Sequence, residues 1–101
     1  MSKTALLAKL PIKEGEKETF LAAFAAVCEQ VDQEAGTEIY ILNWDRKDEN
    51  LAYLYEVYTD KDALKAHSGS DAMQAFQGAL AGILAGAPEL IMLTPDTGKG
   101  L

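Results

Sequence analysis

The segment Leu51–Tyr58 constrains the fold more than any other part of the chain, because a strand built from it has no polar face. Alternate residues of a β-strand point to opposite faces of its sheet. One face would carry Leu51, Tyr53, Tyr55 and Val57, and the other Ala52, Leu54, Glu56 and Tyr58. In a two-layer domain the helices cover one face of the sheet, and the face that meets water is polar. A sheet that contains this strand therefore needs a cover on both faces.

Apolar segments of strand and helix length alternate along the rest of the chain. The segments 38–44 and 51–58 flank a polar turn and predict a hairpin. Apolar residues recur at helical spacing between 16 and 35, and Gly36 follows them as a C-cap signal. The expected elements, in chain order, are a strand at 4–10, a helix at 16–35, strands at 38–44 and 51–58, a short helix after Thr59 or Asp60, a helix from Ser70 to about Gly86, and a strand at 89–94.

This order predicts an α+β domain of ferredoxin-like β-α-β-β-α-β topology, with helices on one face of an antiparallel sheet and a break in the second helical region near Gly69. Residues 1–95 are expected to form a single domain, and residues 96–101 a flexible C-terminal tail. A chain of 101 residues has no spare element for the second face of the sheet. A second copy of the same sheet is the simplest cover. We therefore predict a homodimer whose sheets pack face to face, as a dimeric α/β barrel.

Composition argues against several classes of function. A net charge of −7, with no cluster of Lys and Arg, argues against binding to nucleic acid or to an anionic membrane surface. One cysteine, Cys28, and one histidine are too few for a dedicated transition-metal site, and no glycine-rich phosphate or dinucleotide loop is present. Cys28 is expected in the core. Without a signal peptide or a membrane-spanning segment in the sequence, we expect a cytoplasmic protein that needs neither a metal nor an organic cofactor.

The single histidine and one strand carboxylate are the candidates for chemistry. Glu56 is expected on the helix-facing side of its strand, where a carboxylate is costly without a hydrogen-bond donor. His67 follows Leu64 by three residues, near the inward side of the short helix. Paired with Glu56, the imidazole would have a fixed tautomer and a second ring nitrogen free for a ligand, as a general base requires. Two other interpretations stay open: a structural hydrogen bond between helix and sheet, and a Glu56 held by backbone amides.

Aromatic residues on the strands favour a binding site for a flat ligand. Such a ligand is bound by an aromatic lining with a few polar groups at its ends. Aromatic strand residues also form cores and interfaces, and that alternative stays open. The candidate substrate-binding residues are Tyr40, Asn43, Trp44, Tyr58, Met73 and Phe76.

Four short patterns together resemble the antibiotic biosynthesis monooxygenase family, whose members are small dimeric α+β barrel proteins. The resemblance extends over residues 4 to 95, and its most specific pattern leads from the strand residue Glu56 through an acidic helix cap to Ala63-Leu64-x-x-His67. The other patterns are Lys13-Glu14-Gly15-Glu16, Glu34-x-Gly36-Thr37-x-x-Tyr40, and Ser70 followed by Met73 and Phe76. The chain departs from the family at Glu14 and Ala35, where members often have proline, and at Ala72, where many have a second histidine.

The resemblance implies cofactor-independent oxygenation of a hydroxylated aromatic or quinol by O₂. His67 would then take a phenolic proton, Glu56 would orient His67, and Tyr40 and Trp44 would shape or hydrogen-bond the ligand. Haem is not implied, because the histidine and asparagine of the family's haem-degrading branch correspond to Gln77 and Ala8 here.

The alternative is a non-catalytic dimeric barrel that binds a small molecule or serves a structural role, because the family also includes isomerases and members that only bind. A cavity of roughly 300 Å³ or more beside His67 would favour a ligand, and a solidly packed interior would leave a structural protein.

Overall fold

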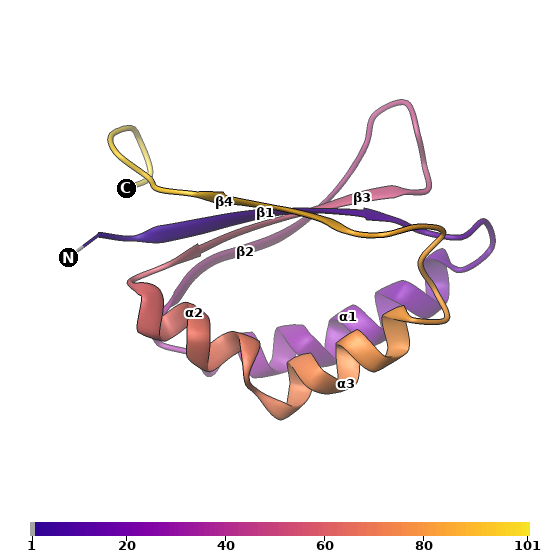
Figure 1. Ribbon diagram of the computed structural model, residues 1–101, viewed down its shortest axis with the longest axis horizontal. Helices are drawn as coiled ribbons and strands as arrows, with labels where there is room; N and C mark the ends of the chain where they lie inside the picture. The colour runs from indigo at the N-terminus through magenta and orange to yellow at the C-terminus, as the bar shows by residue number, and fades with distance from the viewer. Residues whose placement is uncertain (1) are drawn as a thin grey trace.

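The computed structural model describes residues 2–101 and confirms the expected α+β fold (Figure 1). All three helices lie on one face of a four-stranded antiparallel sheet, and the second helical region is divided at Gly69 as expected. The elements are β1 (Thr4–Pro11), α1 (Lys17–Val31), β2 (Thr37–Trp44), β3 (Leu51–Tyr58), α2 (Lys61–Ser68), α3 (Asp71–Leu80) and β4 (Glu89–Leu93).

The strand order β2-β3-β1-β4 places the two-faced apolar strand β3 in the interior of the sheet. Its register puts Glu56 opposite Leu6 of β1 on one side and opposite Tyr40 of β2 on the other. Residues opposite one another in an antiparallel pair share a face. Glu56, Leu6 and Tyr40 therefore form one row across the helix-facing side of the sheet.

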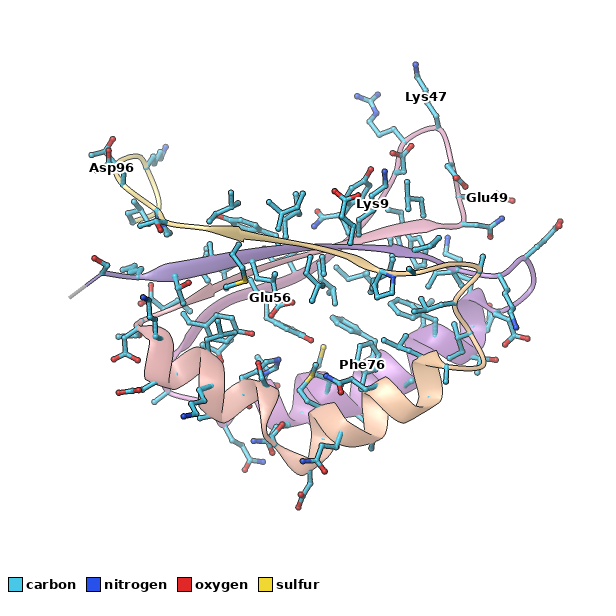
Figure 2. The ribbon with its side chains drawn as sticks, viewed as in Figure 1. Lys9, Lys47, Glu49, Glu56, Phe76 and Asp96 are labelled. Atoms are coloured by element: carbon cyan, nitrogen blue, oxygen red, sulfur yellow. The ribbon has the colours of Figure 1, made fainter. Side chains whose placement is uncertain are left out.

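The core lies between this face and the helices. Phe20, Phe24 and Val27 are buried on one side of α1, which agrees with the helical spacing seen in the sequence. Alternate residues of β3 from Ala52 to Tyr58 are buried against the helices, and Glu56 is among them. Figure 2 shows Glu56 and Phe76 pointing into the space between the layers, whereas Lys9 points away from the helices.

Two helices end earlier than expected. Helix α1 ends at Val31 rather than Ala35, and its chain continues through turn hydrogen bonds, including one from Glu34 N to Val31 O. Helix α3 ends at Leu80 rather than near Gly86. After it, Ile83 is buried and its carbonyl accepts from Lys13 N at 2.9 Å. Backbone pairing with the chain that follows β1 thus replaces the last helical turn, a competition that local periodicity does not reveal.

The sheet face that points away from the helices is largely apolar, although it also carries Lys9 and Asn43, and no element within residues 2–101 covers it (Figure 1). Ile41 of β2 is 52% exposed there, and Leu93 of the edge strand β4 is 43% exposed. Tyr53 and Tyr55 are half-buried on the same face. The chain therefore leaves uncovered the face for which its sequence predicts a partner.

Candidate active site

A cavity of about 260 Å³ lies between the sheet and the helices α2 and α3. Its wall is mostly apolar. Tyr40, Glu56 and His67 meet at one end, and the other polar lining residues are the exposed Ser68 and Gln77. Its exposed rim includes Gln77 of α3 and Leu90 of β4, so the cavity opens beside the edge strand. The apolar lining residues are Leu6, Ala8, Leu10, Leu54, Met73, Phe76, Leu80, Pro88 and Leu90.

His67 is fixed in this wall by the ends of two helices. Asp60, rather than Thr59, caps α2 by accepting a hydrogen bond from Ala63 N at 2.8 Å; the sequence left both residues open. Ser70 caps α3 through Met73 N at 3.2 Å, and its hydroxyl donates to the His67 carbonyl at 2.8 Å. The imidazole is only 2% exposed. Both caps therefore hold the backbone of a fully buried, ionisable side chain.

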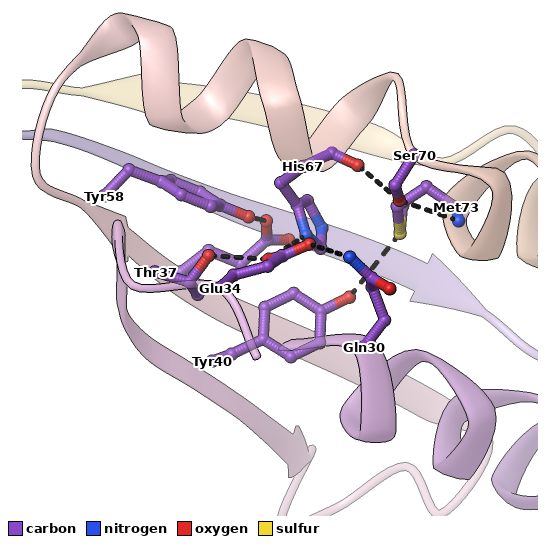
Figure 3. A network of polar contacts seen from close by, with 9 residues as sticks. Gln30, Glu34, Thr37, Tyr40, Tyr58, His67, Ser70 and Met73 are labelled. Carbon is purple, nitrogen blue, oxygen red and sulfur yellow. Dashed lines mark hydrogen bonds and ion pairs between the residues drawn. The ribbon is translucent and has the colours of Figure 1, made fainter. Parts of the chain in front are cut away.

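One ring nitrogen of His67 is hydrogen-bonded to Glu34, which lies in the turn between α1 and β2. The distance from Nδ1 to Glu34 Oε1 is 2.9 Å (Figure 3). Glu34 also accepts from Thr37 Oγ1 at 2.7 Å and from Gln30 Nε2 at 3.3 Å. Burial raises the pKa of Glu34, but the hydrogen bonds from Thr37, His67 and Gln30 together lower it below its usual value. Glu34 is therefore an ionised acceptor.

The carboxylate of Glu34 determines where the neutral imidazole carries its proton. Because an ionised carboxylate can only accept, we assign the proton of a neutral His67 ring to Nδ1. Nε2 then has a free lone pair. This atom is buried and has no hydrogen-bond partner among the described residues. A lone pair without a partner, at the polar end of an apolar cavity, is available to accept a proton from a ligand.

Glu56 does not form the expected hydrogen bond with His67, and that part of the sequence prediction is wrong. Its Oε1 accepts instead from Tyr58 Oη at 2.5 Å, two residues along the same strand. Burial raises the pKa of Glu56, although the Tyr58 hydrogen bond and the proximity of His67 act in the opposite direction. The early end of α1 brings Glu34 to the ring nitrogen that Glu56 was expected to occupy.

The other candidate residues divide into three groups. Tyr40, Met73 and Phe76 line the cavity, and Tyr40 Oη lies 4.0 Å from Met73 Sδ. Tyr58 lies behind Glu56, with its ring centroid 5.4 Å from that of His67. Two residues lie elsewhere and do not line the cavity.

Trp44 and Asn43 are these two residues. Trp44 packs edge-on against Phe20 at 5.8 Å, under the Lys17 ammonium, at the other end of the helical layer. Asn43 lies on the opposite face of the sheet, where its amide donates to Tyr53 O at 3.3 Å. Strand alternation alone places Asn43 on the face opposite Tyr40 and Trp44.

Sequence reasoning missed Glu34 as a site residue. The signal in the sequence is the Glu34-x-Gly36-Thr37 pattern, which contributes to the family resemblance. Within residues 2–101 no group of three or more His, Cys, Asp and Glu side chains could hold a metal ion. Over the same residues, no helix combines the length and apolar character that crossing a membrane requires.

A family model described as antibiotic biosynthesis monooxygenase matches residues 4–79, which span the elements from β1 to α3. The match contains Glu34, Glu56 and His67, and it therefore includes the polar end of the cavity. No curated protein matches the chain significantly.

Solved structures with the same fold come from several bacteria. A candidate antibiotic biosynthesis monooxygenase from Caulobacter crescentus superposes with a TM-score of 0.90 at 27% identity, over 95% of this chain and 92% of that one. A protein from Mycobacterium tuberculosis has a TM-score of 0.90 at 20% identity, over 98% and 100% of the two chains. One from Pseudomonas aeruginosa reaches 0.85 at 24% identity, over 96% and 97%. The last two comparisons show the shared fold alone.

Proposed function

The chain belongs to the antibiotic biosynthesis monooxygenase family, and we propose that it oxidises a small hydroxylated aromatic or quinol with O₂, without a metal or an organic cofactor. One observation carries this proposal. The buried Nε2 of His67 has no partner among the described residues, and His67 lines the polar end of an apolar cavity. General bases are found in such positions, within reach of a ligand and shielded from water.

The cavity volume restricts the substrate to a small molecule. About 260 Å³ is slightly below the roughly 300 Å³ at which ordinary ligand pockets begin. An apolar cavity of about 150 Å³ binds benzene in another protein. A planar molecule of one or two rings is therefore the size of substrate that we propose, with its hydroxyl group directed at His67.

In the proposed reaction His67 Nε2 takes the proton of the substrate hydroxyl and leaves an electron-rich anion. The anion is the only reductant and gives its electrons to O₂. One oxygen atom enters the product, and the other leaves as water with two hydrogen atoms of the substrate. Tyr40 stays protonated, because burial and the nearby Glu56 raise its pKa, and its hydroxyl can donate to a ligand oxygen.

Oxygen uptake with a panel of hydroquinones and naphthohydroquinones tests this proposal. The rate of spontaneous oxidation without protein is subtracted. We expect wild type to exceed that rate and His67→Ala to lose at least about 10²-fold of the enzymatic rate. Lys65→Ala, an exposed change on the same helix, is the matched control. Equal rates for wild type and His67→Ala would refute the role of His67, and binding without oxygen uptake would identify a binding protein.

We also propose that the apolar outer face of the sheet forms a homodimer interface with a second copy of that face. The exposed Ile41 and Leu93 support this proposal, because soluble monomers rarely expose contiguous apolar patches. Sedimentation velocity is the test, with Ile41→Glu expected to give monomer. Leu21→Glu, at an exposed apolar residue of α1, is expected to leave the dimer intact. A monomeric wild type at micromolar concentration would refute the interface.

A further inference from the structure

His67 separates two hollows that open on different sides of the protein. The first is the ligand-sized cavity described above. His67 lines it, and the Nε2 atom of this residue has no hydrogen-bond partner among the described residues. The second is a surface hollow of about 190 Å³, lined by the turn after α1 and by residues of α2. Glu34 and His67 line this outer hollow together, and Thr37 and Gly36 contribute to its wall. His67 therefore lines both hollows, with Nδ1 bonded to Glu34 of the outer hollow and Nε2 without a partner among the described residues.

Glu34 connects the buried ring to the outer hollow. Its side chain is 14% exposed, whereas that of His67 is 2% exposed. The contact between them is a hydrogen bond of 2.9 Å, short enough for direct proton transfer. Thr37 and Gln30 hold the carboxylate in place by donating to it. A proton at Nδ1 thus has a one-step path to a partly exposed acceptor.

We propose that His67 and Glu34 form a proton relay between the ligand cavity and the solvent of the outer hollow, with Glu34 as the positioning residue that determines the tautomer of His67. This inference rests on the proposed function of the cavity. A ligand that fills the cavity excludes water from Nε2, so until reduced oxygen accepts the proton taken there, the ring has no route to solvent through the cavity. The outer hollow supplies such a route through Glu34.

The proton balance of the relay closes over one reaction cycle. The substrate O–H bond breaks as an N–H bond forms at Nε2, and the Nδ1 proton moves to Glu34 Oε1. When reduced oxygen takes up a proton, the Nε2–H bond breaks and Glu34 returns a proton to Nδ1. This restores the starting tautomer. Between the uptake of the substrate proton and the transfer of a proton to reduced oxygen, Glu34 can exchange its proton with solvent.

The hydrogen bonds around the ring, rather than the pKa directions of the two carboxyl groups, favour transfer toward Glu34 over transfer toward the sheet. Those that face His67 are Glu34, Tyr40, Glu56 and Tyr58. Glu56 is already hydrogen-bonded by Tyr58, and it does not contact either ring nitrogen by a hydrogen bond. Tyr40 and Tyr58 keep their protons, because the pKa of each phenol is raised and burial is the main cause. Glu34 is therefore the acceptor for the Nδ1 proton.

The tautomer can be measured without any substrate, because the chain has a single histidine. Protein labelled with ¹⁵N-histidine gives one pair of ring signals, whose chemical shifts show which nitrogen carries the proton. We expect the proton on Nδ1 in wild type and in Glu34→Gln, whose amide oxygen still accepts a hydrogen bond. We expect a mixture of tautomers in Glu34→Ala. A wild-type proton on Nε2 would overturn the relay.

Kinetics separate positioning from proton transfer. Glu34→Gln keeps an acceptor for Nδ1 but cannot take up its proton, so kcat should fall by on the order of 10²-fold while KM changes little. Glu29→Gln, the same charge change at an exposed residue of α1, should leave both constants unchanged. An unchanged kcat in Glu34→Gln would overturn the relay and leave the proposed oxygenase standing. If wild type consumes no oxygen, the proposed function fails, whereas the tautomer measurement still decides the role of Glu34.

Discussion

Replacing Gly36 by alanine would place a methyl group against the short helix that carries His67. A Cβ at Gly36 would lie 2.5 Å from Ala63 Cβ, and carbon atoms in contact are normally about 3.5–4.0 Å apart. Ala63 Cβ is attached directly to the backbone of α2, so no rotamer change can relieve the overlap. The helix or the turn before β2 must therefore move by about 1 Å.

The expected cost follows from this overlap. Overpacking of this kind lowers the free energy of unfolding by about 1–3 kcal/mol. Gly36 does not have a positive φ, so alanine tolerates its backbone conformation and recovers about 0.4–1 kcal/mol through the unfolded state. The net loss should be about 1–2 kcal/mol, which for a domain of this size corresponds to a fall in Tm of roughly 5–15 °C.

Urea unfolding at one fixed protein concentration measures this loss. Gly36→Ala combined with Ala63→Gly removes the overlap, so the double variant should be at least as stable as Ala63→Gly alone. Gly78→Ala is the matched control, because its Cβ meets nothing within 4 Å and the change should stabilise α3 by up to about 1 kcal/mol. A Gly36→Ala protein as stable as wild type would contradict the predicted overlap. So would a double variant that is less stable than Ala63→Gly alone.

Three further variants test the core, a buried carboxyl and a helix cap. Phe76→Ala removes a ring that is 3% exposed and should lower the free energy of unfolding by about 3–5 kcal/mol in urea, with Phe76→Leu losing clearly less; equal losses would contradict the packing. Burial raises the pKa of Glu56, so folding favours the neutral form of this carboxyl group. The free energy of unfolding of wild type should therefore decrease as the pH rises from the ordinary pKa of glutamate through the raised pKa of Glu56. Glu56→Gln should escape that loss, so parallel stability curves between pH 4 and 8 would refute the assignment. Ser70→Ala removes the acceptor for Met73 N and should cost about 1 kcal/mol by thermal unfolding, whereas Ser70→Asn should restore most of it; an equal loss in both would show that the cap contributes little.

Local patterns in the sequence were sufficient to predict the fold and two residues of the candidate site, Glu56 and His67. Strand alternation in Leu51–Tyr58 placed Glu56 on the helix-facing side, and the cap signals before α2 and α3 placed His67 near the end of the first of these two short helices. Both residues line the cavity as expected. These inferences hold because periodicity and capping depend on residues only a few positions apart.

The sequence did not reveal which carboxylate meets the imidazole. Glu34 and His67 are 33 residues apart, and their contact depends on α1 ending at Val31 so that the following turn reaches α2. Helical periodicity carries on to Ala35 and gives no sign of that end. The length of the helix is a result of packing between distant elements, including the close approach of Gly36 to Ala63. The amino-acid sequence therefore determined the layers, the two-faced strand and the positions of Glu56 and His67, whereas tertiary packing selected Glu34 as the partner of His67 and left Nε2 free.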